Sequence, residues 1–340
     1  MEKLRVGVIG VGHLGQHHAR IYSEHKRCHL VGVVDINQKR AAEIAARCRT
    51  QSFFDHKVIL GMVDAVSIAV PTVSHYAIAR DFLEAGVHVL VEKPIANSVS
   101  EASALIQLAK EKNRVLQVGH IEHFNAAIQY AKSILSRPLF VETHRLGPYD
   151  PRVKDIGVVL DLMIHDIDII LQLVNSHIVE MDAVGVNILS SKEDVANVHL
   201  KFENGCTANV TVSRVYPKFM RKVRVFQDNA YISIDCKRQI VEVHRRQPAG
   251  RAGQGEPPYK IVTEKRKFRS KEPLKMEIDH FLECVQEGKK PYVTGEQARN
   301  ALEVVVHITE MIYDRIRKSN LDTHIELPAP LAESAGAPAP

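Results

Sequence analysis

The stretch LRVGVIGVGHLGQH, residues 4–17, decides the fold. It opens with a short apolar run, ends in the pattern Gly10-x-Gly12-x-x-Gly15, and leads into a helix-like sequence. In such a loop the first glycine permits a tight turn, the second lets backbone approach a pyrophosphate, and the third lets helix and strand pack closely. The helix N-terminus presents N–H groups and a positive dipole to the phosphates. We therefore expect a dinucleotide site, with His13 and Leu14 in its loop.

A second apolar run supports this interpretation. Leu30–Val34 ends at Asp35, about 20 residues beyond the glycines, where a carboxylate can accept a hydrogen bond from the adenosine ribose. A carboxylate there repels a 2′-phosphate, so the sequence favours NAD over NADP. A Gly-rich turn followed by a surface aspartate is the simpler alternative, but it leaves the strand–loop–helix–strand–Asp order unexplained.

Composition limits the class of protein. A chain of 340 residues suits two domains, and it has no apolar stretch near the roughly 20 residues that span a bilayer. The N-terminus leads directly into the first strand, which argues against a signal peptide. Five scattered cysteines without CxxC spacing predict reduced thiols in the cytoplasm, and neither a disulfide framework nor a metal site.

The charge balance is mildly basic, at +5. Much of the excess lies between Arg214 and Lys275, without interleaved aromatic residues or a DNA-reading motif. We interpret these runs as solvated loops and strand faces, with some attraction for an anionic substrate. Neither nucleic acid nor membrane is expected as a partner.

The first third of the chain alternates strand and helix patterns. Continuous apolar strands alternating with helices predict a doubly wound parallel sheet that is buried on both faces. The expected strands are 4–9, 30–34, 65–70, 87–91 and 115–118, and the expected helices are 13–24, 38–47, 75–85 and 98–112, the last capped by Ser98 or Ser100.

Beyond about residue 138 the pattern changes. A helical stretch at 156–174 is followed by short strand candidates with hairpin-like turns, which predict a mostly antiparallel sheet. These strands are 178–189, 195–202, 206–213, 222–226, 230–235, 240–244 and 259–263, with helices expected at 273–287 and 294–318. We expect a mobile loop at 245–258. The predicted division is an NAD-binding Rossmann domain at 1–122, a substrate-binding and oligomerisation α+β domain at 123–326, and a disordered Pro/Ala-rich tail at 327–340.

Glu92-Lys93-Pro94 ends one of the expected parallel strands. Ligands of doubly wound sheets bind beyond the carboxyl ends of the strands, so Lys93 can direct its ammonium group at a reacting centre. The proline restricts Lys93 to extended backbone and could follow a cis bond. After another such strand, Pro71-Thr72-x-x-His75 is expected to line the cofactor cleft with Glu92 and Lys93.

The segment 157–168, GVVLDLMIHDID, places ionisable groups on an apolar helix. Asp161 and His165 are four residues apart and would share one face, where the carboxylate could orient the imidazole and raise its basicity. Asp166 and Asp168 follow. Such buried groups are costly unless they are paired or useful, and this set suits proton transfer near neutral pH. A structural histidine at an acidic helix start is the alternative.

A further polar segment, Gly119–Asn125, follows the last expected parallel strand. We expect His120, Glu122, Phe124 and Asn125 to contact a polyhydroxyl substrate. Metal binding by His120, His123 and His165 is the alternative, but no recognised ligand spacing supports it.

Together these motifs, in this order and spacing, resemble the Gfo/Idh/MocA family of NAD(P)-dependent sugar and inositol oxidoreductases. The resemblance implies a large open sheet in the second domain, a homo-dimer or homo-tetramer, and oxidation of a secondary alcohol. Segments 119–125 and 159–168 are most similar to the branch that oxidises nucleotide-activated N-acetyl sugars, such as UDP-N-acetylglucosamine at its 3-hydroxyl, for lipid A or other surface glycans, with an aminotransferase downstream. Inositol or simple sugar dehydrogenases, an NAD-dependent glycoside hydrolase and a non-catalytic NAD-binding regulator are the alternatives.

For this chemistry we assign His165 as general base, oriented by Asp161, and Lys93 as the group that stabilises alkoxide charge. The opposite assignment, with Lys93 as base, stays open. A nucleotide sugar also needs a donor for its diphosphate, and arginine suits phosphate best. The candidates are Arg145, Arg152, Arg214 and Arg221, of which Arg145 and Arg152, around the loop before the catalytic helix, are ranked first.

Overall fold

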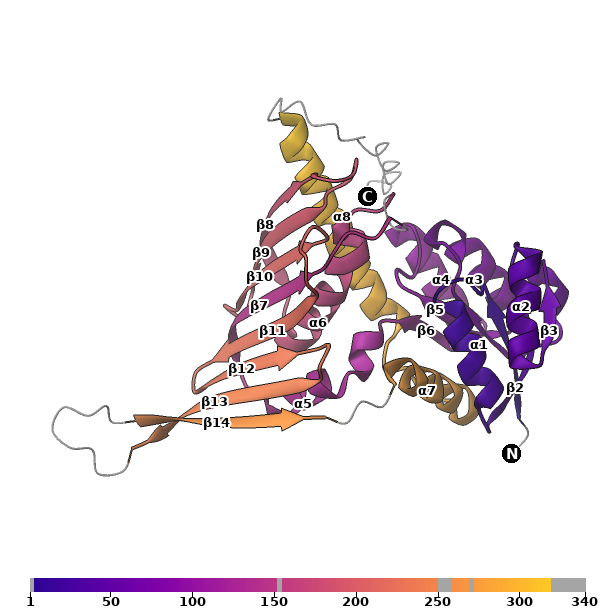
Figure 1. Cartoon of the computed structure of the whole chain (residues 1–340), viewed down its shortest axis with the longest axis horizontal. Coiled ribbons are helices and arrows are strands. Elements are labelled where there is room, and N and C mark those ends of the chain that lie inside the picture. Colours follow the sequence, from indigo (N-terminus) through magenta and orange to yellow (C-terminus); the bar gives the residue numbers. More distant parts are fainter. Residues whose placement is uncertain (1–2, 152–154, 250–258, 269–271, 319–340) are drawn as a thin grey trace, which may run out of the picture.

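The computed structural model describes residues 3–151, 155–249, 259–268 and 272–318. Two sheets organise the chain, one six-stranded and one eight-stranded, and helices lie between them (Figure 1). Arg152 and the predicted tail at 327–340 lie outside the described residues. Across the described chain, no helix has both the length and the apolar character needed to cross a bilayer.

The six-stranded sheet is parallel throughout, with the order β3-β2-β1-β4-β5-β6. This order reverses between β1 and β4, which creates the ligand-binding crevice of a Rossmann fold. The predicted doubly wound sheet is confirmed. Its strands are β1 (Leu4–Ile9), β2 (Cys28–Val34), β3 (Gln51–Phe53), β4 (Ala65–Ile68), β5 (His88–Glu92) and β6 (Leu116–Gly119).

Four α-helices accompany this sheet: α1 (Gly15–Glu24), α2 (Gln38–Cys48), α3 (His75–Glu84) and α4 (Val99–Glu111). Short 3₁₀ turns lie at His56–Ile59, Thr72–Ser74 and Ile121–Phe124. Ser98 caps α4, because its side chain accepts a hydrogen bond from the Glu101 N–H, as one of the two predicted caps would. The short edge strand β3 was not predicted, since three residues are too few for a period to show.

The eight-stranded sheet has the order β14-β13-β12-β11-β7-β10-β9-β8. Only β7 and β10 run parallel, so the prediction of a mostly antiparallel sheet is confirmed. Its strands are β7 (Pro138–Leu146), β8 (Ile178–Val186), β9 (Val195–Phe202), β10 (Thr207–Ser213), β11 (Met220–Gln227), β12 (Ala230–Asp235), β13 (Ile240–Pro248) and β14 (Tyr259–Lys267). The loop expected from residue 245 is wrong over 245–248, which pair with β14.

Helices cover one face of this sheet and leave the other open (Figure 1). They are α5 (Ala126–Ile134), α6 (Ile164–Val174) and α8 (Gly295–Lys318), and a π-helical turn, Val159–Met163, leads into α6. The central strand β7 and helix α5 were not predicted. Strand β7 alternates buried and half-buried residues, among them Glu142 and His144, so it lacks the apolar run expected of a central strand.

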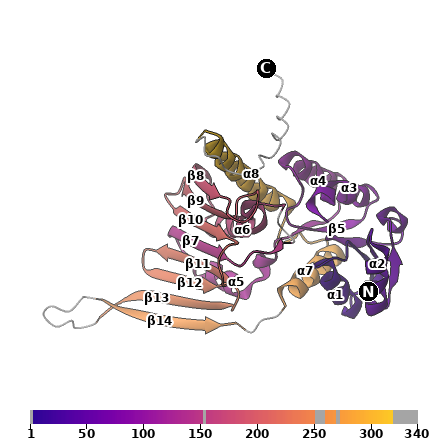
Figure 2. The ribbon, with the colours of Figure 1, turned by 45° about the horizontal axis from the view of Figure 1, so that its top comes forward.

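Helix α7 (Pro273–Glu287) returns to the first sheet, and both ribbon views place it beside α1 (Figures 1 and 2). Its Leu274, Ile278, Phe281 and Leu282 share a buried core with Val6 of β1 and its neighbours. The structure therefore differs from the predicted contiguous 123–326 domain, because α7 completes the apolar cover of the Rossmann sheet.

Candidate functional site

The glycine loop has the geometry that its spacing predicts. Gly10 has φ +81°, a left-handed conformation that favours glycine. A Cβ on Gly15 would overlap the Gly10 carbonyl oxygen, so α1 can begin here only without a side chain. A Cβ on Gly12 would meet nothing within 4 Å, and His13 and Leu14 beside it are exposed. The loop thus leaves an open cradle at the N-terminus of α1, which suits a pyrophosphate.

Asp35 lies beside this cradle at the end of β2. Its Oδ2 accepts from the Val11 N–H and its Oδ1 from the Asn37 N–H, both at 2.9 Å, which fixes the carboxylate against the loop. The loop is also held by Arg40, whose Nε donates to the Val11 carbonyl at 2.9 Å. Arg40 was not singled out in the sequence, because nothing local marks it as a loop contact. The open glycine loop and the fixed carboxylate fit NAD.

The carboxyl ends of β4 and β5 are joined by His75. Its two ring nitrogens lie 2.8 Å from the Pro94 carbonyl oxygen and 2.9 Å from that of Val70, and its side chain is buried. Burial lowers its pKa. His75 therefore positions the strand ends, which differs from the expected direct contact with cofactor. Pro71 and Thr72 stay accessible in the same turn.

Lys93 and Asp161 meet between the two sheets. Lys93 Nζ donates to the Asp161 carbonyl oxygen at 2.7 Å and lies 3.2 Å from Asp161 Oδ1. Their side chains are 16% and 25% exposed, so the pair is shielded but reachable. The Lys93–Pro94 peptide is cis. The contact joins the carboxyl end of β5 to the helix of the second domain, and the sequence did not predict it.

His165 follows on the same helix, half-buried, and its Nδ1 has no hydrogen-bond partner among the described residues. Burial, then the positive charges of Lys93 and Arg145, lower its pKa well below the usual value. The imidazole is therefore neutral near pH 7 and able to accept a proton.

The expected pairing of Asp161 with His165 is not found. No hydrogen bond or ion pair joins these two described side chains, and Asp161 instead contacts Lys93. Asp161 lies in the π-helical turn, and its carboxylate is directed to Lys93 of the first domain.

Behind Lys93, Glu92 forms a buried polar cluster with residues of α1 and α7. Its Oε1 lies 3.0 Å from His18 Nε2. Burial would raise the pKa of Glu92, but the hydrogen bond from His18 and the charge of Lys93 lower it overall. Burial and the charge of Glu92 raise the pKa of Glu277 well above its usual value. The ionised form is thus favoured at Glu92, behind Lys93, and the protonated form at Glu277.

The segment 120–125 is placed differently from the expected substrate surface. Glu122 is buried and bonds Asn125, which in turn caps α5 and donates to the Cys236 carbonyl. Phe124 is 5% exposed and packs on His280 and Tyr292. Glu122, Phe124 and Asn125 are thus almost wholly buried and bound within the protein, which differs from the substrate contact predicted for them.

Arg145 is likewise buried, at 3% exposure. Its guanidinium contacts Asp166 through Nε at 2.8 Å and Glu122 Oε1 through Nη2 at 3.3 Å. With both carboxylates already bound, it has no free fork for a diphosphate, so the role predicted for Arg145 is wrong. Its contact with Asp166 fixes the residue that follows His165.

His120 is fully buried beside Asp168. Its Nδ1 lies 3.6 Å from Asp168 Oδ2, and neither ring nitrogen has a hydrogen-bond partner among the described residues. Asp168 also contacts His123, at 2.9 Å. Burial lowers the pKa of His120, so a neutral imidazole stands near Lys93 and His165. A direct substrate contact for His120 stays a prediction.

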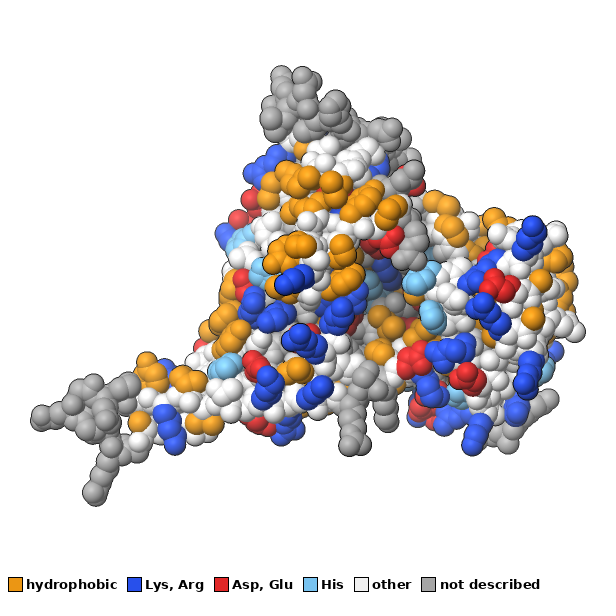
Figure 3. Space-filling view, in the orientation of Figure 1, with side chains coloured by type: hydrophobic (Ala, Val, Ile, Leu, Met, Phe, Trp, Pro, Cys, Tyr) orange, Lys and Arg blue, Asp and Glu red, His pale blue; other side chains and the backbone are white. Residues whose placement is uncertain are grey.

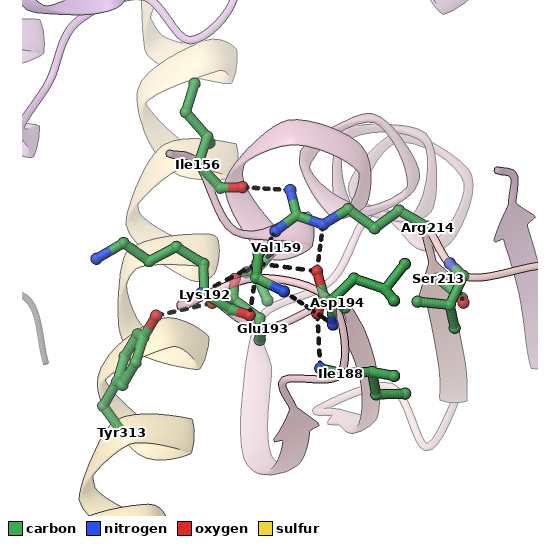
Figure 4. A network of polar contacts seen from close by, with 12 residues as sticks. Ile156, Val159, Ile188, Lys192, Glu193, Asp194, Ser213, Arg214 and Tyr313 are labelled. Atoms are coloured by element: carbon green, nitrogen blue, oxygen red, sulfur yellow. Dashed lines mark hydrogen bonds and ion pairs between the residues drawn. The ribbon is translucent and has the colours of Figure 1, made fainter. Parts of the chain in front are cut away.

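The turn that carries Asp161 is held from behind by Glu193, which the sequence did not reveal, and by Arg214, which was predicted as a diphosphate candidate (Figure 4). Glu193 is buried, and its two carboxylate oxygens accept from the Val159 N–H at 3.2 Å and the Tyr313 hydroxyl at 2.9 Å. Arg214 donates to the Ile156 carbonyl at 2.7 Å and contacts Asp194 at 2.6 Å. The pattern Lys192-Glu193-Asp194 resembles a solvated loop, so no local signal distinguishes it.

Comparison with known families agrees with this geometry. Residues 4–120 match the family described as an oxidoreductase family with an NAD-binding Rossmann fold, and residues 107–233 match its C-terminal domain, GFO/IDH/MocA. The two matches cover the whole first sheet and the helix that carries His165.

Individual relatives extend along nearly the whole chain. A UDP-N-acetylglucosamine 3-dehydrogenase of Acidithiobacillus ferrooxidans is 37% identical over 311 residues, 91% of this chain and 97% of the relative. A solved structure of that enzyme superposes with a TM-score of 0.85 at 36% identity, covering 92% of this chain and 99% of that one. The scyllo-inositol 2-dehydrogenase (NAD(+)) of Bacillus subtilis is 27% identical over 90% of this chain and 93% of its own length.

Proposed function

Because this chain belongs to the Gfo/Idh/MocA family of NAD-dependent oxidoreductases, we propose that it oxidises the 3-hydroxyl of a nucleotide-activated N-acetyl sugar such as UDP-N-acetylglucosamine. The observation that carries the chemistry is the Lys93–Asp161 contact beside a neutral His165, at the carboxyl end of β5. The sugar is proposed from the similarity to the A. ferrooxidans enzyme, which extends over 91% of this chain.

In the proposed reaction the alcohol carbon loses a hydride and its hydroxyl loses a proton. NAD, when bound in the glycine loop, supplies the hydride acceptor. His165 accepts the proton, because its lowered pKa keeps it neutral. Lys93 donates to a carboxylate and a carbonyl oxygen, as an ammonium group does, and is therefore assigned to stabilise the charge that develops on the substrate oxygen. Asp161 positions Lys93.

Two further proposals concern partners. The open face of the eight-stranded sheet carries exposed Val184, Val186 and Phe226, which supports a homo-dimer or homo-tetramer formed through that face. A 3-keto sugar is the substrate class of an aminotransferase, so we place such an enzyme downstream, on the route to a 3-amino sugar for lipid A or another surface glycan.

The test is NADH formation with UDP-N-acetylglucosamine, its uronic acid, free N-acetylglucosamine and myo-inositol, with an aminotransferase present to remove the keto product. We expect activity with the nucleotide sugars. Activity confined to free sugars or inositol would contradict the proposal and favour the simple sugar or inositol dehydrogenase alternative. Release of free monosaccharide without NADH would instead identify a glycoside hydrolase.

A further inference from the structure

One arginine near His165, Arg221, forms no ion pair with the described residues. Arg145 and Arg214 are both buried and bound to carboxylates. Arg221, in contrast, is exposed, and its guanidinium makes no hydrogen bond or ion pair with any residue that the structure describes. An unpaired guanidinium with a planar fork is a ready partner for phosphate oxygens.

The sheet register puts this side chain on the face that carries the site. Arg221 is directly opposite Arg145 in the antiparallel pair of β11 and β7, so the two side chains leave the same face of the sheet. The next residues on that face of β11, Val223 and Val225, are buried under the helices. Arg221 lies at the start of the strand, where this cover ends.

The position is close to the reacting centre. Arg145 bonds Asp166, the residue after His165, and Arg221 is its cross-strand neighbour. The charge of Arg221 is also among those that lower the pKa of His165, after burial and the charges of Lys93 and Arg145. A sugar with its hydroxyl at His165 would therefore have a cation within reach of its anomeric substituent.

Neighbouring residues extend the cationic surface. Phe219, two residues before Arg221, is 57% exposed, and Lys237 Nζ lies 4.6 Å from the centroid of its ring. Figure 3 shows Lys and Arg side chains on the sheet domain beside the hollow that separates it from the Rossmann domain. A flat apolar ring beside two cations matches a nucleoside diphosphate.

We propose that Arg221 binds the diphosphate of the nucleoside diphosphate sugar, an inference that rests on the proposed function. It makes Arg221 the residue that separates nucleotide sugars from free sugars. The charge holds the diphosphate while the sugar ring reaches His165 and Lys93.

The test compares Arg221→Gln with Lys222→Gln in the full-length protein. Both changes remove one positive charge from β11, but Lys222 points to the opposite face of the sheet. A charge-assisted hydrogen bond of ordinary strength predicts that Arg221→Gln raises the KM for UDP-N-acetylglucosamine and the inhibition constant of UDP about 10- to 100-fold. The KM for NAD should change less than about twofold in both variants, and Arg221→Lys should recover part of the affinity.

The outcomes are distinct. If wild type oxidises UDP-N-acetylglucosamine and Arg221→Gln binds it and UDP as tightly as Lys222→Gln does, the inference is wrong while the proposed function stands. If wild type oxidises only free sugars or polyols, the proposed function fails, and the inference with it.

Discussion

At the scale of single residues, the site places a positively charged side chain, Lys93, near a neutral imidazole, that of His165. Lys93 donates to a carboxylate and a carbonyl, while His165 has positive neighbours and an Nδ1 that no described residue hydrogen-bonds. Positive charge nearby disfavours the imidazolium form, so the lysine proposed to stabilise a substrate oxyanion also helps to keep the proposed base neutral. Removing the lysine would therefore alter both steps.

This arrangement predicts the pH dependence. The lowered pKa of His165 means that the free enzyme holds its base in the neutral, active form at pH 6.5, and loses activity only as the pH falls through that lower pKa. We expect the acidic limb of kcat/KM to lie below pH 6.5. His165→Ala should lack this limb and lose about 10²- to 10⁴-fold in kcat, with NADH binding unchanged.

His307→Ala is the matched control, because His307 is 56% exposed on α8 and should leave the limb in place. If the acidic limb of kcat/KM in wild type lay at or above pH 6.5, His165 would not be the base. The same conclusion would follow if the limb persisted in His165→Ala.

Some residues of the site can be predicted from the sequence and others cannot. Lys93 and His165 can be found because each belongs to a local motif at a strand end or on an apolar helix. The burial of Arg145 cannot be found this way, because its partners Glu122 and Asp166 are distant in sequence and meet only after the two domains fold together.

At the scale of elements, a close contact between Gly157 and the Glu193 side chain holds the π-helical turn that carries Asp161. A Cβ on Gly157 would overlap the Glu193 carboxylate, whose oxygens already accept from Val159 and Tyr313. With the Glu193 carboxylate in this position there is no room for a side chain at residue 157, and we expect displacement of Glu193 to move Asp161 away from Lys93.

This contact predicts that the effects of mutating Gly157 and Glu193 on kcat are not additive. Gly157→Ala should lower kcat roughly 10- to 100-fold through misplacement of the turn, with the KM for NAD unchanged. Glu193→Ala should also lower kcat, because it removes two hydrogen bonds. The double variant should be no slower than Glu193→Ala, since the overlap is gone.

Gly61→Ala is the control, because a Cβ there meets nothing within 4 Å. Additive losses in the double variant would show that the two residues act independently and that the contact does not position the turn.

Helices and strands whose apolar residues repeat with a clear period are predicted well from the sequence, and the other elements are predicted poorly. Strand β1 and helix α7 match their expected bounds, since an apolar strand and a capped amphipathic helix are visible in the residues themselves. The π-helical turn is not visible, because no residue period marks it and the Glu193 that contacts it is distant in sequence.

At the scale of the whole molecule, the Rossmann domain is completed by a helix from the far end of the chain. Phe281 of α7 is fully buried in the core formed with Val6, Val8 and Tyr22. Sequence order suggests a domain that ends near residue 122, but the apolar face of α1 and β1 is covered only when α7 returns.

Stability of the cofactor site should therefore depend on α7. Phe281→Ala in the full-length chain should cost about 3–5 kcal/mol of stability, as removal of a buried aromatic side chain usually does. We expect its urea midpoint to fall and NADH binding to be lost in the same transition, because α1, which begins at the glycine loop, packs on this core. Phe54→Ala, at an exposed phenylalanine of the same domain, should leave the midpoint unchanged. If Phe281→Ala kept its NADH-binding transition while the second domain unfolded first, α7 would belong to that domain, and the Rossmann unit would be stable without it.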